Sequence, residues 1–150
     1  MISRFYQGLI DIGTFFQDWL LLAIRGYWGF SFFLSGLGKL LEIDPIISYF
    51  ASLGIPFPEI NAYVASWIEF LGGFCLLIGF AARLVSIPLA LNMIVALLTA
   101  HLDAVKTIFS DPQNFIVQLP FNYLLAVLIV FAFGPGKISI DYLIEKWRSR

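Results

Sequence analysis

Four stretches of the chain are apolar over the length of a membrane crossing. They cover about 19–41, 60–80, 84–102 and 113–134, and a spanning helix needs roughly 20 mostly apolar residues. Gly134-Pro135-Gly136 is expected to end the last helix, and Pro120 should either kink that helix or mark its true start. The pattern therefore predicts four membrane-spanning helices.

Both ends of the chain alternate between apolar and polar positions at helical spacing. Residues 1–18 carry an apolar stripe opposite a polar one, which predicts a helix on the membrane surface that leads into the first span. The apolar stripe is Ile2, Phe5, Leu9, Ile12 and Phe16, and the polar stripe is Arg4, Gln7, Asp11, Thr14 and Asp18. Near the other end, Ser139 suits the N-cap of a short amphipathic helix.

The loops between spans contain helix-start signals of their own. Asp44-Pro45 reads as an N-cap followed by proline at the first helical position, which predicts a short helix over about 45–53 ended by Gly54. Asp111-Pro112 repeats this pattern before the fourth span. The predicted fold is all-α: an integral membrane four-helix bundle in one domain, 1–150, with short amphipathic interfacial helices at both termini and in the first outer loop.

The distribution of basic residues predicts an orientation. Four spans place both termini on one side, together with the second loop. That side holds six basic residues, namely Arg4, Arg83, Lys137, Lys146, Arg148 and Arg150, whereas the other side holds only Lys39 and Lys106. Because cytoplasmic loops are enriched in lysine and arginine, the N- and C-termini are predicted to be cytoplasmic.

Composition narrows the classes of function. Apolar residues make up 60% of the chain and charged residues 13%, and the net charge of −1 argues against nucleic-acid binding, which needs a basic surface. Cys75 is the only cysteine, so no intramolecular disulfide can form. The sequence contains no phosphate-binding loop, nucleophile elbow, zinc-protease pair or dinucleotide fingerprint.

Two charged residues, Arg25 and Glu69, lie inside predicted spans, where a charge costs about 2.5–3.5 kcal/mol on insertion scales. Each shares a helix face with small residues, which allow close helix approach. On the first span these are Gly29 and Gly36, together with Phe32 and Lys39; on the second they are Ala62, Ala65, Ser66, Gly72 and Gly73. Measured from the inner ends of the spans, Arg25 is about 9 Å deep and Glu69 about 16 Å. We therefore expect the two faces to meet and the two charges to form an ion pair.

This expected pair has a structural and a functional interpretation. It could serve only to fix the register of the two helices. Alternatively, Glu69 could be a proton-relay carboxylate, or the pair could anchor the head group of a quinone or a similar ligand.

A second polar group is predicted at the outer rim, formed by Lys39, Glu42, Glu59, His101 and Asp103. One histidine with scattered carboxylates is a poor metal site, so no metal is predicted. His101 is expected to be an interfacial hydrogen-bonding residue or a proton donor beside a pocket. Asn92 and Thr99 are expected to form hydrogen bonds across helices.

Several short motifs, taken in their order and spacing, resemble the DoxX family over about residues 20–142. They are Arg25, Ser35-Gly36-Leu37-Gly38-Lys39-Leu40, Tyr49-Phe50 with Leu53-Gly54-Ile55-Pro56, Glu69-Phe70-Leu71-Gly72-Gly73, Gly79 with Arg83, Thr99-Ala100-His101, and Gly134 to Asp141. The resemblance implies a four-helix protein of the bacterial inner membrane, with relatives such as the DoxD-type subunit of thiosulfate:quinone oxidoreductase. By analogy, Arg25, Lys39, Glu69 and His101 would line a quinone or substrate site.

Three functions are compatible with these observations. The first is a membrane subunit, or partner, of a quinone-linked oxidoreductase; since the chain has no redox centre of its own, a redox partner protein would supply the electrons. The second is a non-enzymatic membrane anchor or assembly factor. The third is a small proton or solute transporter, which with four spans and no inverted repeat would need to oligomerise.

Overall fold

The structure of the protein is a computed structural model that describes residues 2–149. Over these residues the chain is entirely α-helical, without a strand. The helices are α1 (Ile2–Leu41), α2 (Ile43–Ser52), α3 (Pro58–Ile78), α4 (Ala82–Thr99), α5 (Leu102–Lys106), α6 (Pro112–Ile116), α7 (Leu119–Phe133) and α8 (Ile140–Arg148). The all-α prediction is confirmed.

Three of these helices are long and apolar enough to cross a membrane: Tyr6–Leu41 of α1, Pro58–Ile78 and Ala82–Thr99. The fourth predicted span, 113–134, is divided into α6 and α7. Pro120 lies in the first turn of α7 and so marks its true start. With 15 residues, α7 is about 22 Å long, which is shorter than a hydrocarbon core of about 30 Å.

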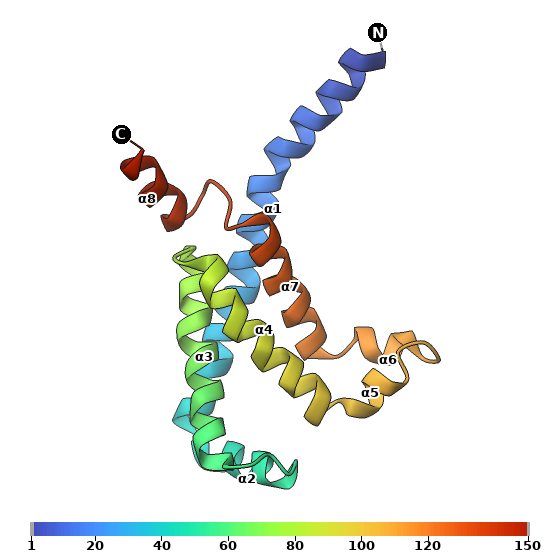
Figure 1. Cartoon of the computed structure of the whole chain (residues 1–150), viewed down its shortest axis with the longest axis vertical. Helices are drawn as coiled ribbons and strands as arrows, with labels where there is room; N and C mark the ends of the chain where they lie inside the picture. The colour runs from blue at the N-terminus through green and yellow to red at the C-terminus, as the bar shows by residue number, and fades with distance from the viewer. Residues whose placement is uncertain (1, 150) are drawn as a thin grey trace.

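Two helix pairs form the body of the molecule: α1 packs along α3, and α4 packs along α7 (Figure 1). Between them lies an apolar core, which includes Phe32, Leu76, Leu89, Met93, Val127 and Val130. Gly79 follows α3 at φ 70°, a left-handed conformation that glycine adopts without strain, and it allows the chain to turn at once into α4. This packing places the facing sides of α1, α3 and α4 around one buried region.

The predicted surface helix over 1–18 is not a separate element. It is the first part of α1, which runs unbroken for 40 residues, or about 60 Å, and projects beyond the other helices (Figure 1). No proline interrupts this stretch, and a single glycine such as Gly13 costs a helix only about 1 kcal/mol. Met1, Arg150 and the side chains of residues 2–5 lie outside the described part of the structure, so the Ile2, Arg4 and Phe5 positions of the two stripes and the charge of Arg150 are not placed.

The short helices match the sequence with one correction. Ser139 caps α8 by accepting a hydrogen bond from the Tyr142 N–H at 3.2 Å, as predicted. Asp111 likewise caps a helix, but that helix is the short α6. The prediction that Asp44 caps the helix of the first loop is wrong, because α2 begins two residues earlier than predicted, at Ile43, and Glu42 occupies the N-cap without a side-chain hydrogen bond.

Candidate functional site

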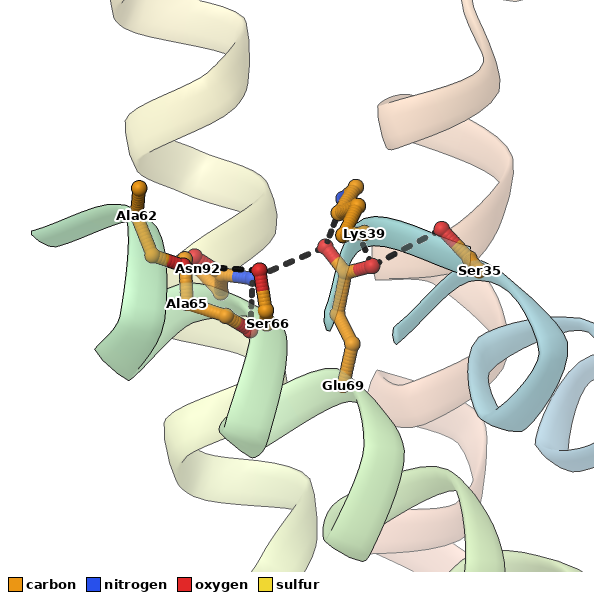
Figure 2. Close-up of polar contacts among 7 residues, drawn as sticks. All are labelled: Ser35, Lys39, Ala62, Ala65, Ser66, Glu69 and Asn92. Atoms are coloured by element: carbon orange, nitrogen blue, oxygen red, sulfur yellow. Dashed lines mark hydrogen bonds and ion pairs between the residues drawn. The ribbon is translucent and has the colours of Figure 1, made fainter. Parts of the chain in front are cut away.

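The Glu69 carboxylate is the centre of a buried polar cluster that joins three helices (Figure 2). Glu69 is only 3% exposed. From α1, the Lys39 ammonium donates to both carboxylate oxygens at 2.6 Å, and the Ser35 hydroxyl donates to Oε2 at 2.8 Å. From α4, the Asn92 side-chain amide donates to Oε1 at 3.0 Å. One charged and two neutral donors thus satisfy the oxygens of the buried carboxylate.

Small residues bring the backbones close enough for these contacts. A Cβ atom on Gly29 would lie 2.7 Å from the Leu77 backbone nitrogen, and one on Gly36 would collide with the backbone of Phe70. Gly73 of α3 meets the backbone of Phe33 in the same way. The predicted close approach of these faces of α1 and α3 is confirmed. Gly72 instead faces Leu89 of α4.

The ion pair expected between Arg25 and Glu69 does not form. Arg25 is 1% exposed and donates from Nη2 to the carbonyl of Ile138, whereas Glu69 pairs with Lys39. The reason is the antiparallel register that the glycine contacts set. Ser35 lies opposite Glu69. Arg25 lies ten residues, or about 15 Å, from Ser35 toward the start of α1, where it lies opposite Gly79. Of the predicted pair, the structure therefore places only Glu69 in the central cluster.

Two cavities border the cluster. The larger, about 530 Å³, lies among α2, α3 and α4 and is lined mainly by apolar and aromatic side chains, among them Tyr49 and Phe50. The smaller, about 370 Å³, lies among α1, α4 and the start of α7, beside Gln118 and Tyr123. Four residues line both cavities: Lys39, Glu69, Ala96 and His101. The Lys39–Glu69 pair therefore lies in the wall that the two cavities share.

The predicted outer-rim group is only partly assembled. His101 lies between α4 and α5 and lines both cavities, and Lys39 belongs to the central cluster. Glu42, Glu59 and Asp103 line neither cavity. Within residues 2–149, no three His, Cys, Asp or Glu side chains gather as a metal site would require.

The sequence predicted an interhelical hydrogen bond for Asn92, but it predicted neither that Asn92 binds Glu69 nor that Ser35 belongs to the cluster. The predicted hydrogen bond of Asn92 across helices is confirmed, but that of Thr99 is wrong, because its hydroxyl donates to the Val95 carbonyl of its own helix. Ser35 precedes Lys39 by four residues, a spacing that places two side chains side by side on a helix. That spacing is the sequence signal that could have placed Ser35 beside Lys39.

Comparison with known proteins now identifies the family. Residues 20–102 match the sequence model of the DoxX family. The chain belongs to this family. The matched range includes all the residues of the central cluster, namely Ser35, Lys39, Glu69 and Asn92, whereas the 134–141 motif of this DoxX protein lies outside it.

Two curated relatives align with this DoxX chain over most of their length. One, from Bacillus subtilis (strain 168), is named "Putative oxidoreductase CatD" and is 35% identical over 115 residues, which cover 77% of this chain and 72% of the relative. The other is an uncharacterized protein of Haemophilus influenzae, 31% identical over 134 residues, or 84% of this chain and 83% of the relative. No solved structure matches the chain.

The 134–141 segment closes the end of the bundle opposite the cluster. The Ile138 carbonyl accepts from Arg25, and the Lys137 N–H donates to Asp18 at 3.0 Å. Asp141 accepts from the backbone N–H groups of Ala81 and Ala82 at 2.7 and 2.9 Å, so it caps α4 from another element. In this DoxX protein Arg25 thus belongs to a structural closure.

Proposed function

We propose that this protein is a membrane-embedded partner or subunit of a quinone-linked oxidoreductase, and that the larger cavity holds the quinone head group. The observation that carries the proposal is this cavity: an apolar space of about 530 Å³ with Lys39, Glu69 and His101 in its wall. Ligand sites are typically apolar cavities of about 300–1,000 Å³ with a few polar groups that fix the ligand's orientation.

The lining fits the two parts of a quinone. Tyr49 and Phe50 offer aromatic faces for a flat ring, and Lys39 and His101 offer donors for its carbonyl oxygens. Val64, Leu91 and Val95 line the same cavity and are 49–58% exposed, so the cavity reaches the outer surface of α3 and α4. An isoprenoid tail could leave there into the lipid.

In this proposal a partner supplies the electrons: within residues 2–149 no three His, Cys, Asp or Glu side chains gather, and Cys75 is the single cysteine of the sequence. The word oxidoreductase in the name of the Bacillus subtilis relative supports a redox setting. The distribution of basic residues supports a multi-pass protein of the bacterial inner membrane with both termini in the cytoplasm.

Binding of decyl-ubiquinone to the full-length protein in nanodiscs tests this proposal. We expect saturable quenching of tryptophan fluorescence, and a Kd raised about 2- to 100-fold in Lys39→Met and His101→Ala, since loss of a hydrogen bond costs about 0.5–3 kcal/mol. Lys106→Met is the matched control, because Lys106 lines neither cavity. Absence of saturable binding, or equal affinity in all variants, would contradict the proposal.

A second function, that of a membrane anchor for a partner protein, is favoured by the projecting part of α1. This part carries exposed apolar side chains, including Leu9, Ile12 and Phe16 at 50–61% exposure. Deletion of residues 2–17 would then abolish co-purification of a partner from native membranes while leaving quinone binding unchanged. Retention of the partner by the shortened chain would exclude this function for α1.

A further inference from the structure

The two carboxylate oxygens of Glu69 accept hydrogen bonds from side chains that line different cavities. Oε1 accepts from Asn92, which lines the larger cavity but not the smaller. Oε2 accepts from Ser35, which lines the smaller cavity but not the larger. Lys39 contacts both oxygens and lines both spaces. The carboxylate is therefore reachable from either side of the shared wall.

The smaller cavity has the features of a water-accessible space. Its lining includes the hydroxyl of Ser35, the amide of Gln118 and the phenol of Tyr123 beside the charged pair. Val117 and Leu119, 63% and 67% exposed, also line it, so it reaches the surface where the chain passes from α6 to α7. Although much of its wall is apolar, these donors and acceptors give ordered water the several polar partners it needs.

We propose that Glu69 transfers protons from the smaller cavity to the ligand in the larger one. This role rests on the proposed quinone site. Reduction of a quinone to a quinol consumes two electrons, which a redox protein supplies, and two protons. For each proton, the carboxylate takes H⁺ at Oε2 from bulk solvent, relayed by water beside Ser35 that is left neutral; the protonated group then rotates about its Cγ–Cδ bond, and the proton passes to a ligand oxygen. Glu69 returns to the carboxylate form, stabilised by Lys39, and the second proton follows the same route.

Other titratable groups are less suitable for this transfer. Arg25 lies about 15 Å further along α1 and contacts Ile138 instead. Tyr123 lines only the smaller cavity, packed against Phe32 with ring centroids 4.3 Å apart. Lys39 and His101 also line both cavities. Because Lys39 already donates to both carboxylate oxygens, His101 is the competing route that the experiment includes.

The test uses full-length protein in nanodiscs on an electrode, which supplies the electrons, with decyl-ubiquinone as the probe. Quinone affinity, the rate of reduction at saturating quinone in H₂O and D₂O, and the infrared change of the carboxyl group on reduction are measured separately. We expect Glu69→Gln to slow reduction at least about 100-fold and to abolish the infrared change, since a general acid or base contributes about 10²- to 10⁴-fold. Ser35→Ala should slow reduction about 10-fold, with an increased solvent isotope effect and an unchanged Kd.

Lys106→Met is the control, because Lys106 lines neither cavity and its loss should change neither quinone affinity nor the reduction rate. Asn92→Ala removes the other hydrogen bond to the same carboxylate, so it should change quinone affinity and slow reduction less than Ser35→Ala does. Wild-type rates in Ser35→Ala and Glu69→Gln, with quinone bound, would overturn the proton role alone, as would loss of reduction in His101→Ala but not in Glu69→Gln. Failure of the wild-type protein to bind quinone would overturn the proposed function and this role with it.

Discussion

The Lys39 ammonium lies 2.6 Å from the Glu69 carboxylate and connects α1 to α3 where the two helices approach most closely. The Lys39 side chain is 32% exposed and that of Glu69 4%, so the carboxylate depends on its partner more than the ammonium does. A buried ion pair contributes little net stability relative to a well-packed apolar pair, but removal of one partner leaves an uncompensated charge.

Lys39→Met should therefore lower the free energy of unfolding by about 3–5 kcal/mol, whereas Lys39→Met/Glu69→Leu should recover most of that loss. Equilibrium unfolding in mixed micelles measures both variants. The control is Lys137→Met, since the Lys137–Asp18 pair, 3.2 Å apart, is largely exposed and should contribute no more than about 1 kcal/mol. A double variant as unstable as the single one would show that the pair contributes more than charge balance.

The two glycines Gly36 and Gly38 provide a matched test of the α1–α3 contact. A Cβ atom at Gly36 would collide with the backbone of Phe70, whereas one at Gly38 would have no neighbour within 4 Å. Gly36→Ala should cost about 1–3 kcal/mol through overpacking and should separate Lys39 from Glu69. Gly38→Ala should be neutral or stabilising by up to about 1 kcal/mol, because alanine favours a helix. Thermal unfolding of the two variants in one detergent compares them directly, and equal stability would contradict this helix contact.

The sequence was sufficient to predict which faces meet but not which residues lie opposite each other. Gly29, Gly36 and Gly73 identified the contacting faces of α1 and α3, because a helical wheel shows directly which face carries the small residues. Which residue of α1 lies opposite which residue of α3 depends on how closely the two backbones pack and on where α3 ends. Neither can be read from a short stretch of sequence. The predicted ends of the spans placed Arg25 and Glu69 at compatible depths, so the predicted ion pair joined Glu69 to Arg25 in place of Lys39.

Boundaries were harder to predict than helices, for a similar reason. The first 18 residues alternate as a surface helix would, but nothing in their sequence stops the helix, so α1 continues through Asp18 into its apolar part. Asp111 was recognised as a cap, yet the helix it caps ends after five residues, before Pro120 begins α7. Capping signals predict where a helix begins more reliably than how long it runs.

Arg25 should act as an anchor for the chain segment after α7. Its Nη2 group donates to the Ile138 carbonyl, while Nε and Nη1 have no hydrogen-bond partner in the described structure. Arg25→Ala should therefore speed amide hydrogen exchange over 134–141, and Arg25→Met should do the same at a smaller loss of stability, because it fills the space without burying unpaired donors. Lys146→Met, an exposed change in α8, is the control. Unchanged exchange in Arg25→Ala would mean that other contacts hold the segment.

Substitution of Asp141 and of Ala81 should change the stability of the start of α4 in opposite directions. Ala81 occupies the left-handed region at φ 47°, a conformation that costs a non-glycine residue about 1–3 kcal/mol, and Asp141 holds it there by accepting from its N–H. Asp141→Ala should thus lower the free energy of unfolding by about 1–2 kcal/mol, the usual cost of losing a helix cap. Ala81→Gly should raise it by up to about 1 kcal/mol, since the strain disappears while the hydrogen bond remains.

Because the strain and the cap act on the same residue, we expect the loss caused by Asp141→Ala to be smaller in an Ala81→Gly background, where the turn no longer needs to be held. Unfolding of the four proteins in one double-mutant cycle measures this coupling, and strictly additive effects would show that Asp141 caps α4 without holding the turn.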